Sequence, residues 1–172
     1  MRVVVDTSAL VAIAFGEPER DAFVAALGRA ERVLVSTVSV VEARMVVHGR
    51  RGQRAVVLLD DLSRLPMFEL CAPGPTETDA ACAAFVAFGK GSGHAAALNF
   101  GDVFSYALAK LRNLPLLSKG HDFSETDIVS ALAAWGAQTP GLAAEEAAAT
   151  VSTGPQGGSG TTSRTGRLRQ PP

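Results

Sequence analysis

Four short apolar runs recur along this chain, with longer segments of helical pattern between them. The runs are residues 3–5, 33–36, 68–72 and 114–118. The first consists of three valines, a composition typical of a strand buried on both faces of a parallel sheet. Antiparallel neighbours can be joined by short turns, so consistently helical connections favour parallel pairing. The pattern therefore predicts an α/β sandwich around a mostly parallel central sheet.

The connecting segments have the spacing and the punctuation of helices. Pro18 ends the first helix, and a Gly/Arg cluster at 49–52 is expected to interrupt the third. Apolar residues recur on one face in most of the segments. The predicted helices are residues 9–15, 19–30, 38–48, 53–65, 76–87 and 102–111.

The composition changes near the end of the chain. Residues 154–172 are rich in Gly, Ser, Thr, Pro and Arg and show no periodic apolar face. Such a segment buries too little surface to offset its ordering entropy. We therefore expect a folded domain over residues 1–135 and a low-complexity, disordered tail over 136–172. The tail's arginines could contact RNA, but a solvated tail without a function is the simpler interpretation.

The bulk composition excludes several classes of protein. The net charge of −1 gives no indication of nucleic-acid binding. Cys71 and Cys82 lie outside any zinc-ligand spacing, and we expect both to be buried thiols in a reducing compartment. The apolar run at 3–5 is too short for a signal segment, and no run approaches the ~20 residues of a transmembrane helix. These features predict a cytoplasmic protein.

Four acidic residues fall at the ends of predicted elements: Asp6, Glu42, Asp102 and Asp122. In a parallel sheet the carboxyl ends of the strands share one edge, so these carboxylates are expected to meet there. Packed carboxylates repel one another unless a cation offsets their charge. Oxygen ligands suit Mg²⁺ or Mn²⁺, and a metal held in this way supports phosphodiester hydrolysis.

Each acid also has a structural explanation. Asp6 and Asp102 could cap the helices that follow them. Glu42 could be an exposed helix residue, and Asp122 could pair with Lys119 or His121 in a loop. Their joint placement after successive strands favours a shared site.

Four segments of the chain resemble the motifs of PIN domains, in the form found in a branch of VapC toxins. They are residues 4–10, 39–43, 98–110 and 116–128, and the resemblance covers about residues 2–130. It implies a PIN-like α/β/α sandwich with an acidic catalytic set and with Asp6 and Asp102 as the metal ligands. Thr7 or Ser8 would add a hydroxyl. Relatives often carry an acid at position 121, so the fourth position falls on Asp122 or on His121. The implied catalytic residues are Asp6, Glu42, Asp102 and Asp122.

The resemblance also implies a function and partners. The chain would be a Mg²⁺-dependent endoribonuclease, with Mn²⁺ as a second candidate metal, and the toxin of a toxin–antitoxin pair. Its partners would be an RNA substrate, a cognate VapB-type antitoxin and a second copy of the chain, with operator DNA bound only through the antitoxin. Five cations are candidates for RNA contacts or are ordinary surface: Arg44, Arg50, Arg51, Lys90 and Lys119.

Two other classes of function remain in view. The first is a PIN-like protein that binds RNA or a partner without cleaving. The second is a phosphoryl-transfer enzyme of another α/β fold, but the paired aspartates of a receiver domain are missing after the first strand. No Gly-x-x-x-x-Gly-Lys-Ser/Thr motif occurs, which excludes a P-loop enzyme.

Overall fold

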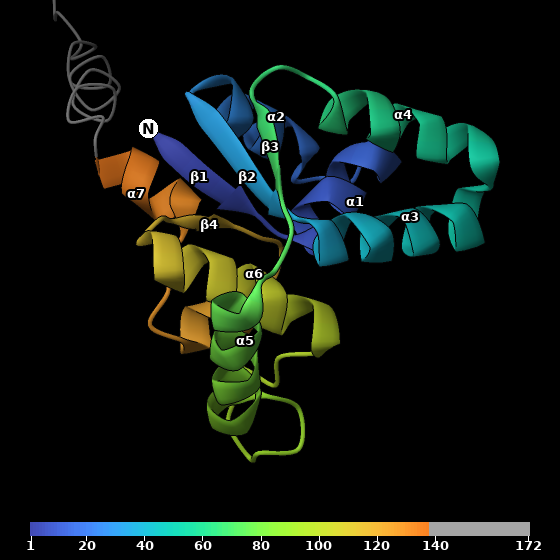
Figure 1. Cartoon of the computed structure of the whole chain (residues 1–172). Helices are drawn as coiled ribbons and strands as arrows, with labels where there is room; N and C mark the ends of the chain where they lie inside the picture. The colour runs from blue at the N-terminus through green and yellow to red at the C-terminus, as the bar shows by residue number, and fades with distance from the viewer. Residues whose placement is uncertain (138–172) are drawn as a thin grey trace, which may run out of the picture. The chain divides into compact units, whose positions relative to one another are not determined.

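Four parallel strands form the central sheet, in the order β3-β2-β1-β4 (Figure 1). The computed structural model describes residues 1–137. In this part of the chain β1 (Arg2–Val5) pairs with β2 (Arg32–Ser36) on one side and with β4 (Leu116–Leu117) on the other. The remaining strand, β3 (Phe68–Cys71), pairs with β2. The predicted parallel sheet is confirmed.

The six predicted helices are present, and a further helix at Ala131–Ala137 was not predicted. The sixth helix begins at Phe100, two residues earlier than expected. The third, α3, runs through Gly49 to Arg51 and is capped by Gly52, whose φ is 71°. A glycine inside a helix costs only about 1 kcal/mol, so Gly49 does not break it. The bounds are α1 Thr7–Phe15, α2 Arg20–Gly28, α3 Thr37–Arg51, α4 Gln53–Ser63, α5 Pro75–Phe88, α6 Phe100–Arg112 and α7 Ala131–Ala137, with a 3₁₀ turn η1 at Asp122–Glu125.

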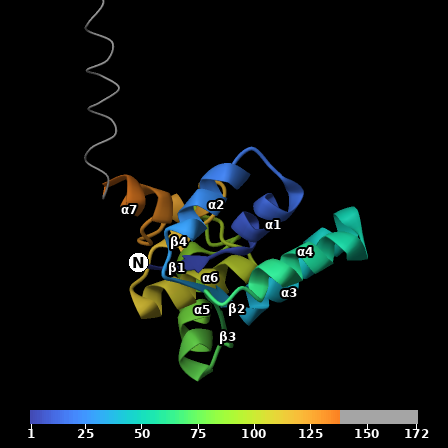
Figure 2. The same ribbon diagram turned by 90° about the horizontal axis from the view of Figure 1, so that it is seen from above.

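Helices cover both faces of the sheet, which explains the run of three valines. Val3 and Val5 point into a core shared with α1, α2, α3, α4 and α7. Val4 points the other way, into a second core formed with α5 and α6. All three side chains are fully buried. Figures 1 and 2 show α5 and α6 on one side of the sheet, and α1, α3 and α4 on the other.

The strand order creates a switch point beside β1. The chain moves outward from β1 through β2 to β3 and then returns to place β4 on the opposite side of β1. In such sheets the crevice at the carboxyl ends of the strands flanking the switch point is the usual site of function. Asp6 follows β1 at this crevice, and the loop that leads to His121 and Asp122 follows β4.

The prediction of two buried cysteines was wrong: Cys82 is exposed, and Cys71 is only half-buried. Helix α5 turns Ala81 and Ala84 toward the core, so Cys82 lies on the outer face. Burial and the neighbouring Glu69 carboxylate raise the pKa of the Cys71 thiol.

Two expectations concern the ends and the environment of the chain. The predicted tail at 136–172 lies, from residue 138 on, outside the described residues. Within residues 1–137, none of the helices has the length and apolar composition needed to cross a membrane.

Candidate active site

One carboxylate oxygen of Asp6 accepts hydrogen bonds, and the other is buried without a partner among the described residues. The residue follows β1 and caps α1, and its Oδ2 accepts hydrogen bonds from the Ser8 amide (2.8 Å) and the Ser8 hydroxyl (2.6 Å). Its Oδ1 is buried and has no hydrogen-bond partner among the described residues. The whole residue is only 1% exposed. A buried oxygen without a donor is costly, so its position indicates a ligand that comes from outside the protein chain.

Glu42 is held against the start of α1 by a hydroxyl group. The residue lies on α3 and is half-buried. Thr7 Oγ1 donates a 2.7 Å hydrogen bond to Glu42 Oε2. The first turn of α6 approaches the same carboxylate, because a Cβ atom on Gly101 would lie 1.9 Å from Oε2. Glu42 can occupy this position only because residue 101 has no side chain.

Asp102 both caps its helix and belongs to the acidic cluster. Its Oδ2 accepts a 2.8 Å hydrogen bond from the Asn99 amide, and Asn99 Oδ1 accepts in return from the amides of Gly101 (2.7 Å) and Asp102 (3.1 Å). This is a capping box at the start of α6. Asp102 is 7% exposed.

The pKa of Asp102 indicates that the predicted acids lie close together in one site. The pKa of Asp102 is raised from 3.8 to about 7. Burial is the largest cause, followed by the negative charge of Asp6. The hydrogen bond from the Asn99 amide opposes the rise, and the charges of Glu42 and Asp122 add to it. The other three acids proposed from the sequence therefore lie within electrostatic range of Asp102.

Asp122 is the most exposed member of this group. It is the first residue of η1, and its carboxylate forms no hydrogen bond or ion pair with other described residues. The loop pairing considered from the sequence is absent there, because Lys119 binds Glu17 (2.7 Å) and Glu19 (3.0 Å) instead. His121 is also exposed and precedes the turn.

For Asp6 and Asp102, a role as a helix cap and a role in the acidic site do not exclude one another. Asp6 and Asp102 are helix caps, as the simpler interpretation holds, and each also faces the charges of the other acids. A carboxylate has two oxygens, so one can cap a helix while the other serves a ligand.

The donor set fits a hard divalent cation that keeps part of its water shell. Within residues 1–137 no group of three acidic, histidine or cysteine side chains is close enough to hold a metal ion by itself. Magnesium typically takes one or two carboxylates and retains several waters. The unpaired Asp6 Oδ1 and the Asp102 carboxylate, whose negative charge is disfavoured in the absence of a cation, match this requirement.

The sequence did not indicate the buried hydroxyl groups of Ser39 and Ser105, which lie on the same two helices as Glu42 and Asp102. Ser39 and Ser105 are fully buried and share a 3.0 Å hydrogen bond that joins α3 to α6. Ser39 lies three residues before Glu42, on the same side of α3, and its carbonyl accepts a 3.3 Å bond from Thr7 Oγ1. That spacing is the signal that could have indicated a supporting role for Ser39.

Most of the cations proposed as RNA contacts are engaged elsewhere. Arg44 pairs with Asp60 at 2.7 Å, and Lys119 pairs with the two glutamates before α2. Arg50 and Arg51 stack over the ring of Phe15. Lys90 forms no ion pair with the described residues, so it is the candidate with its charge free.

The fold and the acidic edge of the sheet define the class of this protein. The PIN domain profile matches residues 3–129, nearly all of the described chain. The chain belongs to the PIN-domain family.

Relatives within that family identify the group more closely. Ribonuclease VapC30 of Mycobacterium tuberculosis is 43% identical over 128 residues, covering 74% of this chain and 97% of that protein. The chain is thus a homologue of the VapC ribonucleases, which are toxins of toxin–antitoxin systems.

Two solved structures show the same fold at low sequence identity. The crystal structure of M. tuberculosis VapC20, described as a toxin that cleaves the sarcin-ricin loop, aligns with a TM-score of 0.63 at 18% identity. It covers 74% of this chain and 96% of its own. VapBC2 from Rickettsia felis, bound to a DNA fragment from its promoter, aligns with a TM-score of 0.59 at 13% identity, over 76% of this chain and 96% of its own.

Proposed function

We propose that this protein is a metal-dependent endoribonuclease and the toxin of a VapBC-type toxin–antitoxin pair. Asp6, Glu42, Asp102 and Asp122 are its catalytic residues, and Asp6 and Asp102 hold Mg²⁺ or Mn²⁺. The observation that carries the proposal is the buried Asp6 Oδ1, which has no partner among the described residues and lies in a cluster that raises the pKa of Asp102. Because its substrate would be RNA, we propose that the protein acts in the cytoplasm.

Some of these side chains would bind the metal ion, and others would hold the metal-binding side chains in position. Ser8 fixes Oδ2 of Asp6 through two hydrogen bonds, which leaves Oδ1 for the cation. Thr7 fixes Glu42, which orients the attacking water or the cation. Asp122 is exposed and adds negative charge at the rim. When bound, the cation supplies a water of lowered pKa and neutralises charge on the phosphodiester.

Cleavage of a mixed pool of structured RNA tests this proposal. Total tRNA is incubated with the protein in Mg²⁺ and in EDTA, alongside Asp6→Asn and the control Asp79→Asn, which alters an exposed acid on α5. We expect Mg²⁺-dependent cleavage by the wild type and by the control, and none by Asp6→Asn. If the wild type binds this RNA but leaves it uncut with Mg²⁺ and with Mn²⁺, a PIN-like binding protein without nuclease activity replaces the proposal.

An apolar groove beside Glu42 supports an antitoxin partner. The groove has a volume of about 560 Å³ and is bordered by Val41 and Met45 of α3 and by Phe100 of α6. Phe100 is 73% exposed. Exposed apolar surface of this kind marks interaction sites. We propose that a VapB-type antitoxin covers it, places a basic side chain near the carboxylates and provides the contacts with operator DNA.

Co-expression with the cognate antitoxin tests this assignment. Phe100→Asp should lose co-purification with the antitoxin but keep RNA cleavage. If Phe100→Asp co-purifies with the antitoxin as well as the wild type does, the antitoxin binds to another surface.

An adjoining apolar surface, which shares Phe100 with the groove, supports a homodimer. Phe85 and Val86 of α5 are exposed beside Phe104 of α6. We propose that two copies of the chain pack through this surface. Light scattering on the purified protein should give the dimer mass for the wild type and the monomer mass for Val86→Glu. A monomeric wild type would contradict the dimer.

A further inference from the structure

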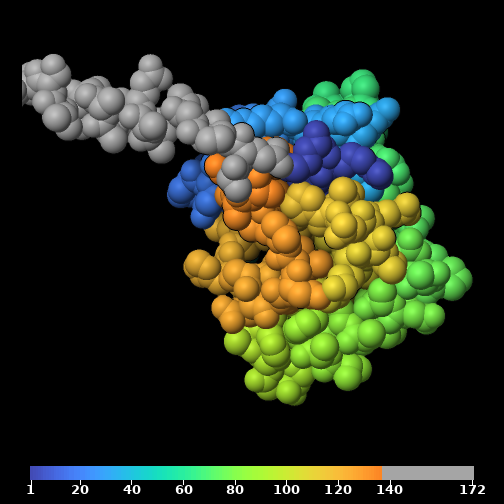
Figure 3. Space-filling view, turned by 90° about the vertical axis from the view of Figure 1, so that its left-hand side faces the viewer, coloured from blue at the N-terminus to red at the C-terminus, as the bar shows by residue number. Residues whose placement is uncertain are grey.

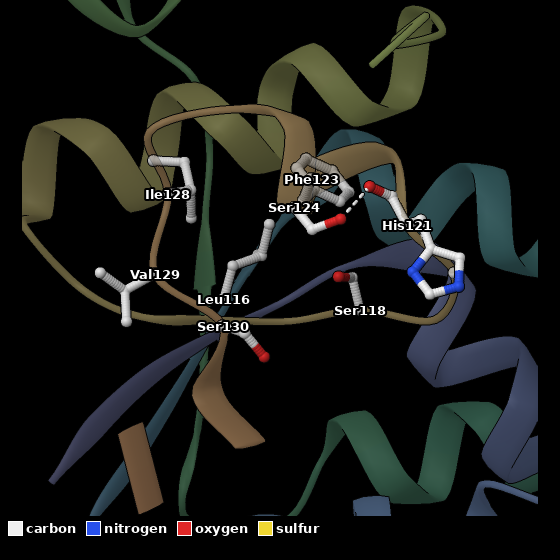
Figure 4. A pocket seen from close by; sticks show the side chains of 9 residues that line it. Leu116, Ser118, His121, Phe123, Ser124, Ile128, Val129 and Ser130 are labelled. Atoms are coloured by element: carbon white, nitrogen blue, oxygen red, sulfur yellow. Dashed lines mark hydrogen bonds between the residues drawn. The ribbon is translucent and has the colours of Figure 1, made fainter. Parts of the chain in front are cut away.

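A separate pocket lies beside β4, close to the acidic site. Its volume is about 380 Å³, within the range of small-molecule sites. Leu116 and Phe123 are buried in its wall, and Ile128 is half-buried there. Figure 4 shows Ile128 and Val129 toward one end and His121 at the other, with Leu116 between them. In Figure 3 the last described segment, coloured orange, forms a strip beside the yellow atoms of the α6 region. The functions proposed above leave this pocket unused.

The pocket combines an apolar wall with neutral polar groups. The hydroxyls of Ser118 and Ser130 line it, and neither forms a hydrogen bond with another described residue. Ser124 donates a 2.6 Å hydrogen bond to the His121 carbonyl, which fixes the backbone of that loop (Figure 4). The lining contains no acidic side chain. A hydroxyl can both donate and accept, so the free groups can pair with a ligand of either kind.

The wall of the pocket is continuous with the acidic site. Ser118 lines the pocket, and the amide of the next residue, Lys119, donates a 2.9 Å hydrogen bond to Ser8 Oγ. Ser8 in turn holds Asp6. His121 lines the pocket and precedes Asp122 in the chain. The pocket is therefore linked to the acidic site through Ser8 and through the loop that carries His121 and Asp122.

We infer that this pocket binds one nucleobase of the RNA substrate, beside the phosphodiester that is cleaved. A base has flat apolar faces, which suit Leu116, Phe123 and Ile128, and a polar edge, which suits the free hydroxyls. The exposed imidazole of His121 provides a ring on which a base can stack. The inference rests on the proposed ribonuclease activity and assigns the pocket a role in selecting the cleavage site.

Nucleoside titration tests the pocket without depending on cleavage. Adenosine, guanosine, cytidine and uridine are added in turn to the full chain without metal, and backbone amide shifts are followed by NMR. The variant Val129→Trp is designed to fill the pocket from a lining residue that is 59% exposed. Its backbone carbonyl, which accepts from the Leu116 amide at 2.9 Å, is retained. Val129→Ala is the matched control.

We expect saturable shifts at Ser118, His121 and Phe123 for at least one nucleoside. These shifts should persist in Val129→Ala and disappear in Val129→Trp. A second variant, with Ser118→Ala and Ser130→Ala combined, should weaken binding without filling the pocket, and it replaces Val129→Trp if that variant does not fold. Absence of saturable binding to the wild type, or binding that both variants retain, would overturn the inference.

A cleavage assay separates this inference from the proposed function. On tRNA, Val129→Trp should change the set of cleaved positions or reduce cleavage at least tenfold, although all four acids are present. An active wild type whose rate and cleavage positions are unchanged in Val129→Trp would overturn the pocket assignment and leave the nuclease standing. A wild type that does not cleave would contradict the nuclease itself, and the nucleoside titration then decides the pocket alone.

Discussion

The Glu42 carboxylate occupies the space that a side chain on Gly101 would fill. An added Cβ would lie 1.9 Å from Glu42 Oε2 and 2.5 Å from its carboxyl carbon. The atoms in the way are the end of a flexible side chain, so Glu42 would move and the fold would remain. Helix α6 thus sets the position of an acid on α3.

The variant Gly101→Ala should therefore lose activity without losing stability. Displacing Glu42 from the Thr7 hydroxyl should reduce RNA cleavage by about 10–100-fold, as for other residues that orient metal sites. The midpoint of thermal unfolding should stay within a few degrees of the wild type. Gly49→Ala is the control, because its added methyl would meet nothing within 4 Å. Full activity in Gly101→Ala would show that the position of Glu42 does not matter.

The Ser8 hydroxyl links Asp6 to the loop after β4. It donates to Asp6 Oδ2 and accepts from the Lys119 amide. Ser8→Ala leaves that amide without a partner and leaves Asp6 Oδ2 with only the hydrogen bond from the residue 8 amide, which should reduce the free energy of unfolding by about 1–3 kcal/mol. RNA cleavage should fall as well. Chemical denaturation and cleavage assays would measure both effects.

Ser63→Ala provides the comparison for Ser8. Its hydroxyl donates only to the Leu59 carbonyl on α4, far along the chain from the acids. This variant should keep full cleavage. Equal losses of cleavage in the two variants would mean that Ser8 acts through general stability.

The raised pKa of Asp102 gives the metal-free protein a specific pH dependence. Between about pH 4 and pH 7 the folded protein binds more protons at Asp102 than the unfolded chain does. The contribution of Asp102 to stability therefore falls as the pH rises through this window. Asp102→Asn removes the charge and keeps an oxygen that can accept from the Asn99 amide.

At pH 8 without metal, Asp102→Asn should be more stable than the wild type, by on the order of 1–3 kcal/mol. At pH 4 the difference should largely vanish, because Asp102 is then protonated in the folded protein. Urea unfolding across this pH range would measure the difference. A variant less stable than the wild type at pH 8 would contradict the proposed repulsion among the carboxylates.

The sequence was sufficient for the fold because local and global signals agree. The valines at 3–5 require cover on both faces of the sheet, and the amphipathic segments between strands provide it. The sequence also placed Asp6 directly after the first strand and Asp102 at the start of a helix, as the structure has them. The sequence could not show how each acid is held, since Ser8 and Gly101 act through contacts between elements distant along the chain.

The burial of small residues was equally hard to predict. Cys82 lies in an alanine-rich helix where nearly every position could face the core, and the sequence does not distinguish its two sides. The pocket beside β4 is formed by a loop and an irregular segment without periodicity, so no pattern indicated it.

Direct titration with a divalent cation is the measurement closest to the central claim. Calorimetry with Mn²⁺, and competition by Mg²⁺, would be performed on the wild type, Asp6→Asn and the surface control Asp79→Asn. We expect one saturable site in the wild type and in the control, with affinity reduced at least tenfold in Asp6→Asn, because that variant replaces the oxygen that now lacks a partner. Equal affinity in all three proteins, or no saturable binding in the wild type, would contradict a metal site at these carboxylates.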